Sequence, residues 1–162
     1  MFIVETMETI ANPDTLPVTK GSYALVINLP TDVRLSIDRL NKPEMIAGRY
    51  IYAGSANGSG GLRARLARHL RTSKAIRWHV DYLTTVAGVD ALAALPGANE
   101  CDIVAALSSV DGVSFPHPGF GSSDCKNCRS HLLRVPPSVG VETVLGLMGG
   151  EGVIWRRPPP TV

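Results

Sequence analysis

Basic side chains are concentrated in one segment of the chain, where they could neutralise phosphate groups. Between Met45 and Val80 there is no Asp or Glu, and the window holds seven basic residues: Arg49, Arg63, Arg65, Arg68, Arg71, Lys74 and Arg77. Such segregation is the electrostatic pattern of a polyanion-binding surface, although a solvated helix face gives the same pattern. Five of these residues are predicted to contact nucleic-acid phosphates without sequence preference: Arg63, Arg68, Arg71, Lys74 and Arg77.

Arg65 and His69 stand four residues apart, so they share one face of a predicted helix. A guanidinium can stabilise the charge that develops on a phosphate, and an imidazole with a pKa of ~6.5 can accept a proton near neutral pH. Each residue also has a structural interpretation. Arg65 could hold a phosphate without catalysis, and His69 could pack beside the apolar stripe of the helix.

The spacing Cys125-x-x-Cys128-x-x-His131 suits a tetrahedral zinc site. His117 or Asp124 could complete four ligands, whereas Cys101 could be a core group. Two other interpretations stay open. The cysteines could be reduced thiols in a hydrogen-bonded loop, or the loop could border a substrate groove shaped by Ser123, Asp124 and His131.

The elements that must position these residues follow from the apolar pattern. Strands are predicted at 21–29, 33–37, 48–54, 89–95 and 132–135. Helices are predicted at 62–71, after a glycine-rich loop, and at 100–108, where Asn99 can cap the first turn. Residues 77–85 fit either a strand or a helix. This order predicts a small α/β or α+β domain.

Two short motifs lie on predicted strands, Gly21-Ser22-Tyr23 at the start of one and Tyr52-Ala53-Gly54 at the end of another. Together with the basic helix, they resemble the GIY-YIG nuclease superfamily. Ser22 and Ala53 replace the central residues of the two family motifs. The usual Pro-x-Tyr-Asn ending is replaced by GFGSSDCKNCRSHL at 119–132, which resembles a poorly characterised branch also found fused to a base-excision DNA glycosylase.

The resemblance implies roles for six residues. Tyr23 and Tyr52 match the motif tyrosines, and Gly54 the motif glycine. Arg65 matches the catalytic arginine, and His69 a position that carries Tyr or His. Glu100 matches the glutamate that binds Mg²⁺ or Mn²⁺, with Asp102 as its competitor. The implied reaction is metal-dependent hydrolysis of DNA, with Tyr52 ranked ahead of His69 as the base that deprotonates water.

The implied fold is a small, mainly antiparallel three-stranded sheet flanked by helices, with a loop-rich C-terminal extension. We expect an N-terminal lead-in over 1–19, a GIY-YIG-like domain over 20–135 and a C-terminal extension over 136–162. Tyr23 and Tyr52 could instead be a cross-strand aromatic pair. Glu100 could serve only to complement the dipole of its helix.

Two other functions are also compatible with the sequence. One is a nucleic-acid-binding module without cleavage, which would keep the basic helix but lack a competent metal site. The other is a zinc-stabilised protein-interaction module on the same scaffold. RNA stays open beside DNA, and a protein partner could supply specificity to either nucleic-acid activity.

Length and composition limit the class of protein that the chain can be. The chain has 162 residues, of which 44% are hydrophobic and 19% charged, enough for one domain with a buried core. No apolar run approaches the ~20 residues that span a bilayer, and the N-terminus does not resemble a secretory signal. We therefore expect a cytoplasmic protein with no membrane partner, whose three cysteines are thiols or metal ligands.

Overall fold

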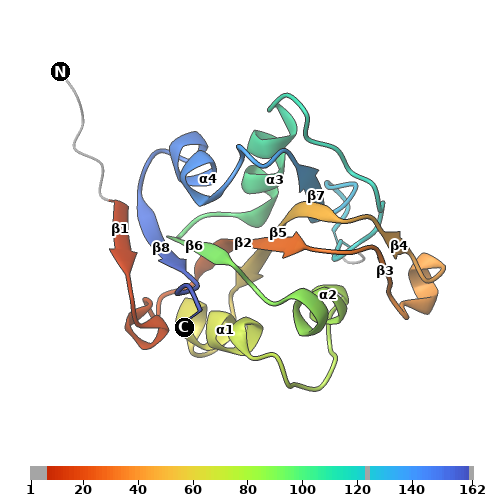
Figure 1. Cartoon of the computed structure of the whole chain (residues 1–162). Coiled ribbons are helices and arrows are strands. Elements are labelled where there is room, and N and C mark those ends of the chain that lie inside the picture. The colour runs from red at the N-terminus through yellow and green to blue at the C-terminus, as the bar shows by residue number, and fades with distance from the viewer. Residues whose placement is uncertain (1–6, 123–124, 161–162) are drawn as a thin grey trace.

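Six strands form the central sheet of the domain (Figure 1). The computed structural model describes residues 7–122 and 125–160. In spatial order the strands are β1 (Met7–Ile10), β8 (Gly152–Arg156), β6 (Ala91–Pro96), β2 (Gly21–Leu29), β5 (Gly48–Ala56) and β7 (Leu132–Val135). All neighbours are antiparallel except β1 and β8, so the sheet is mixed. A separate two-stranded ribbon consists of β3 (Val33–Arg34) and β4 (Glu44–Met45).

Four helices cover the two faces of the sheet (Figure 1). The first pair, α1 (Gly61–Leu70) and α2 (His79–Ala87), packs on one face. The second pair, α3 (Glu100–Ser108) and α4 (Val141–Leu147), packs on the other. Strand β2 lies between the two layers and is buried along almost its whole length. The two short helical turns are η1 (Pro13–Thr15) and η2 (Asp38–Leu40).

Local sequence signals explain where two of the helices begin. Asn99 accepts a hydrogen bond from the Cys101 backbone N–H at 2.7 Å, and this N-cap starts α3 at Glu100, as predicted. Helix α1 follows the glycine-rich loop, and Leu62 and Leu66 of its apolar stripe are fully buried against the sheet. Arg65 and Glu100 therefore belong to helices on opposite faces of the sheet.

The sheet is larger than the three strands predicted. Strands β1 and β7 have four residues each and β8 has five, and they extend both edges of the central strands β6, β2 and β5. β1 pairs with β8 from the other end of the chain, which a local pattern cannot reveal. The predicted lead-in thus contributes β1, and the predicted extension contributes α4 and β8.

Two further local predictions need correction. The strand expected at 33–37 is reduced to the two residues of β3, because the chain turns into η2 soon afterwards. The ambiguous segment 77–85 forms α2, whose Val80 and Leu83 are buried at helical spacing. Within the described ranges, no helix has the length and apolar character needed to cross a bilayer.

Candidate active site and the adjoining cysteine cluster

A cavity of about 1010 Å³ opens where one edge of the sheet is incomplete. Strand β7 pairs only with Arg49 to Tyr52 of β5, so the last residues of β5 have no strand beside them on that edge. The gap lets side chains from both faces reach a common space. The lining includes most of the predicted site: Tyr23, Tyr52, Gly54, Arg65, Arg77, Glu100, Cys125 and His131.

The two motif tyrosines lie on the same face of the sheet. Tyr23 is opposite Gly54, and Tyr52 is opposite Leu25, in the antiparallel β2–β5 ladder. A Cβ atom at position 54 would collide with the Tyr23 hydroxyl, so the glycine of the second motif makes room for the tyrosine of the first. Burial raises the Tyr52 pKa to about 12, although the nearby Arg65 charge acts in the opposite direction.

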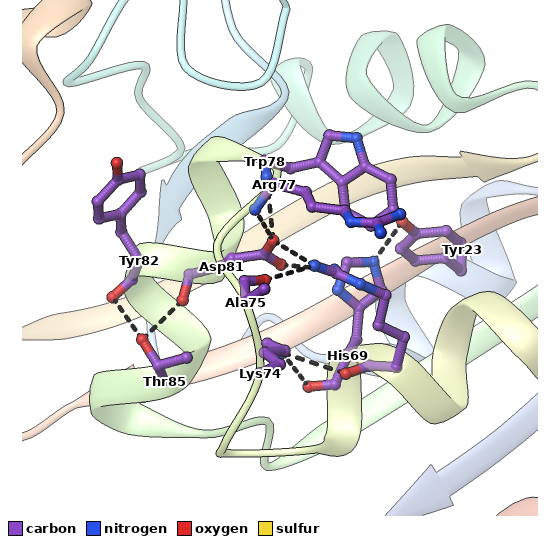
Figure 2. A network of polar contacts seen from close by, with 10 residues as sticks. Tyr23, His69, Lys74, Ala75, Arg77, Trp78, Asp81, Tyr82 and Thr85 are labelled. Carbon is purple, nitrogen blue, oxygen red and sulfur yellow. Dashed lines mark hydrogen bonds and ion pairs between the residues drawn. The ribbon is translucent and has the colours of Figure 1, made fainter.

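His69 lies behind the tyrosines and does not line the cavity. Its Nε2 shares a hydrogen bond of 2.6 Å with the Tyr23 hydroxyl, and its side chain is buried (Figure 2). Burial lowers the His69 pKa to about 3, with the Lys74 charge acting in the same direction. The imidazole is therefore neutral at physiological pH and positions Tyr23.

Arg65 is fixed by two contacts. Its Nη1 donates to the Ser55 carbonyl at 3.0 Å, and its guanidinium carbon lies 4.3 Å from the centroid of the Trp78 ring. The bond to Ser55 uses one of the five N–H donors of the guanidinium. The stacked side chain is half-buried at the edge of the cavity, where donors remain for an anion.

Arg68, predicted to contact phosphate, is engaged within the protein. Its guanidinium donates to both oxygens of Asp81, at 2.9 and 2.8 Å, and Asp81 is fully buried. The backbone N–H groups of Arg77 and Trp78 donate to the same carboxylate (Figure 2). Despite burial, these bonds lower the Asp81 pKa to about 2. The network fixes the segment between α1 and α2 and places Trp78 beside Arg65.

The other basic residues predicted to contact phosphate differ in whether their side chains are hydrogen-bonded within the protein. Arg63 donates to the Leu16 carbonyl at 2.6 Å. Lys74 donates to the Arg68 and His69 carbonyls at 3.2 and 3.0 Å, which satisfies the C-terminal end of α1. Arg71 and Arg77 are exposed.

Glu100 brings a carboxylate from the opposite layer into the cavity. It is the first residue of α3 and is half-buried. Its carboxylate makes no hydrogen bond or ion pair with any residue in the ranges 7–122 and 125–160. Asp102, its competitor in sequence, is exposed and does not line the cavity.

Four soft donor groups converge beside Glu100. One ligand atom each from Cys101, Cys125, Cys128 and His131 lies within 4.8 Å of all the others, and this cluster could hold a zinc ion. Cys101 joins it from α3, whereas His117 is outside it. Ser123 and Asp124, also named as candidates, lie outside the described residues.

A comparison with protein families accounts for most of the chain. Residues 22–147 match the family described as a domain of unknown function, DUF123. The chain belongs to the DUF123 family. No curated protein and no solved structure matches it. The matched range contains the cavity residues and the cysteine cluster of this DUF123 domain, and it extends past residue 135 to include α4.

Sequence reasoning missed three residues that shape the site of the DUF123 domain. Cys101 had no ligand-type spacing to the other cysteines, and only the fold brings its sulfur to 3.5 Å from that of Cys125. Trp78 and Asp81 fell in the segment whose secondary structure was ambiguous. No local pattern in the sequence indicated that Asp81 is buried or that it pairs with Arg68.

Proposed function

We propose that this DUF123 domain is a metal-dependent endonuclease that hydrolyses phosphodiester bonds in DNA. The observation that supports it best is the convergence of Tyr23, Tyr52, Arg65 and Glu100 on one cavity, although they come from β2, β5, α1 and α3. These are the residue types that phosphodiester hydrolysis requires, and they match the positions implied by the GIY-YIG resemblance.

The charge of the cavity favours an anionic substrate. Among the described residues, its lining contains four permanent cations, Arg39, Arg65, Arg77 and Lys126, and two carboxylates, Asp38 and Glu100. Four minus two leaves an excess of two positive charges. The volume of about 1010 Å³ is at the upper end of typical small-ligand pockets, enough for more than a single phosphate.

Glu100 fits the role of a divalent-cation ligand. Mg²⁺ is commonly bound by one or two carboxylates, with water and substrate phosphate completing its octahedron. A half-buried carboxylate without a described protein partner, at the edge of a cationic cavity, meets that need. Bound there, Mg²⁺ or Mn²⁺ would supply a Lewis acid that withdraws charge from a phosphate oxygen.

Arg65 is placed to stabilise the charge that develops on the phosphate during attack. Its contacts with Ser55 and Trp78 hold the guanidinium before substrate arrives, so little reorganisation is needed during the reaction. Lysine would keep the charge at this position but lose the planar stacking on Trp78 and the fork of donors.

Tyr52 is the better placed of the two proton acceptors, because it lines the cavity and His69 does not. With its pKa raised to about 12, its hydroxyl is protonated at neutral pH and can orient a water molecule or a phosphate oxygen. To act as a base it must first lose its own proton to solvent, and a divalent cation bound at Glu100 would add the positive charge, beyond that of Arg65, which this deprotonation needs. His69 contributes indirectly, because its hydrogen bond positions the Tyr23 hydroxyl.

The deciding experiment is a cleavage assay on labelled duplex, branched and single-stranded DNA, with RNA counterparts, in Mg²⁺, Mn²⁺ or EDTA. We expect metal-dependent DNA cleavage that falls by about 10²- to 10³-fold in Glu100→Gln and in Arg65→Lys. Asp102→Asn, on the exposed face of the same helix, and Arg63→Lys, on the same turn as Arg65, are the matched controls and should retain activity.

Three results would contradict the proposal or change it. Cleavage that survives Glu100→Gln would remove the assigned ligand. Cleavage of RNA alone would change the substrate class. Salt-sensitive DNA binding without cleavage in any metal would favour a binding module, and Arg71→Ala should then lower the slope of log affinity against log salt by about one.

A further inference from the structure

We propose that Cys101, Cys125, Cys128 and His131 bind one Zn²⁺ with no open coordination position, and that this ion fastens the loop of residues 125–131 to the first turn of α3. The proposal is independent of the cleavage reaction, because it concerns a second metal site with different donors. It assigns Cys101, which the sequence pattern did not connect with the other cysteines, as the fourth ligand.

The spacing of the donors fits one tetrahedral ion. With Zn–S distances of about 2.3 Å, two thiolates at tetrahedral positions are about 3.8 Å apart. The Cys101 and Cys125 sulfurs are 3.5 Å apart, and all four ligand atoms lie within 4.8 Å of one another. This space suits one ion but leaves no room for a cluster of several irons and sulfides between the cysteines.

The chemistry of the donors selects zinc over the hard cation proposed at Glu100. Thiolates and imidazole are soft or borderline ligands, whereas Mg²⁺ prefers oxygen. Three Cys and one His form a complete structural zinc set, and catalytic zinc sites usually keep one position for water or substrate. The assigned ion therefore has a structural role, although it lies next to Glu100.

One detail of the ligand set supports a bound metal. The Nε2 atom of buried His131 has no hydrogen-bond partner in the described ranges, an arrangement that costs free energy unless another group completes it.

The position of the cluster shows what the ion would do. Residues 109–131 connect α3 to β7, and no helix or strand lies in the part of this segment that the structure describes. A long irregular segment gains most when its ends are clipped together. Cys101 is the residue after Glu100. By binding Cys101, the ion would therefore link the loop to the start of α3, where Glu100 carries the proposed catalytic carboxylate.

Metal content and cobalt substitution test the assignment. The whole chain, purified under reducing conditions without added metal, should contain about one zinc per molecule. After chelation, Co²⁺ should give the strong visible bands of a tetrahedral site together with thiolate-to-cobalt charge transfer, and Zn²⁺ should abolish both. Protein that contains no zinc and gives no such spectrum with Co²⁺ would overturn the proposal.

Variants test the ligand set. Cys101→Ser and His131→Asn should each weaken Co²⁺ binding by more than the 10- to 100-fold typical of losing an outer-shell partner. His117→Asn, the matched control outside the cluster, should bind like wild type. Unchanged binding in Cys101→Ser would refute Cys101 as the fourth ligand. A metal-free Cys101–Cys125 disulfide in freshly isolated protein would refute the site altogether.

Discussion

The cavity has two walls that are built in different ways. We call the first the helical wall: Arg65, Trp78, His79 and Tyr82, from α1, α2 and the segment between them. The second, the loop wall, consists of Gly121, Cys125, Lys126, Asn127 and His131. The helical wall is supported by a buried ion pair and a buried Tyr–His hydrogen bond. The loop wall instead contains two of the four potential metal ligands, Cys125 and His131.

This difference reflects how much regular structure each wall contains. Helix α1 buries an apolar stripe on the sheet, and the Arg68–Asp81 pair joins it to α2, so protein groups alone fix Arg65 and Trp78. In the loop wall, Phe120 is buried and stacks edge-on against His79, and the Gly121 N–H donates to His79 at 2.9 Å. Backbone hydrogen bonds from the Gly119 N–H to the Arg129 carbonyl and from the His131 N–H to the Phe120 carbonyl join this stretch to residues 129–131, and the cysteines lie between the two stretches.

The largest effect is expected from breaking the helical wall. Asp81→Asn would leave the Arg68 charge partly buried without its counter-ion and should lower the free energy of unfolding by about 3–5 kcal/mol. The matched control is Glu44→Gln, which breaks an ion pair whose side chains are 60% and 53% exposed and should cost less than about 1 kcal/mol. Urea denaturation at neutral pH measures both, and equal losses would show that the buried network adds nothing to the helical wall.

Removing the metal should increase hydrogen exchange in the loop wall but not in the helical wall. If zinc is present at 100 times its dissociation constant, its binding stabilises the bound form by about 2.7 kcal/mol, and a chelator removes that contribution. Hydrogen exchange should then accelerate in peptides from the loop wall and the start of α3, but not in peptides from α1 and α2. Cys101→Ser should show the same exchange before the chelator is added. Equal acceleration in both walls would contradict the comparison.

A methyl group at Gly54 should disturb Tyr23, which its hydrogen bond with His69 connects to the helical wall. In Gly54→Ala the new Cβ would collide with the Tyr23 hydroxyl, and overpacking of this kind costs about 1–3 kcal/mol. The control is Gly58→Ala, where nothing lies within 4 Å of the added atom and the change should stay within about 0.5 kcal/mol. Thermal denaturation separates the two, and a Gly54→Ala protein as stable as wild type would show that Tyr23 can move without cost.

Helices α1 and α3 were easier to predict from sequence than α2 and the loop wall. The Asn99 cap and the Leu62–Leu66 stripe are local signals, and both α3 and α1 were predicted nearly to their ends. Cys101 and Cys125 meet only because α3 and the loop converge at the unfinished edge of the sheet. The same limit applies to β1 and β8, whose pairing depends on the whole fold.

The sequence also predicted some residue roles better than others, depending on whether the role is set by nearby residues or by distant ones. The Tyr23 and Gly54 motifs indicated paired strands, and the structure pairs these two residues directly. The basic segment gave the charge of the region correctly, but it could not show that Arg68 is held by Asp81 or that Lys74 caps α1. A charge can be read from one residue, whereas its partner depends on packing between segments.

The smallest effect should come from titrating His69 in the helical wall. Its pKa is lowered from 6.5 to about 3 in the folded protein, so between these values the unfolded chain binds the proton more readily. Stability is therefore retained above the unfolded pKa and falls as the pH drops below it, by up to about 1.4 kcal/mol per pH unit from this residue. His69→Gln removes the titrating group, so its unfolding free energy should fall less steeply between pH 6.5 and 5 than that of wild type.

The difference between the two proteins isolates His69, because the loop-wall ligands and the other histidines titrate in both. His117→Gln is the control: it also removes one imidazole, but a less buried one, so it should keep most of the wild-type pH dependence. Urea denaturation followed by tryptophan fluorescence across this range gives the slopes. Parallel wild-type and His69→Gln curves would mean that His69 binds its proton equally well in the folded and the unfolded protein. The helical wall would then accommodate the charge on His69 without losing stability.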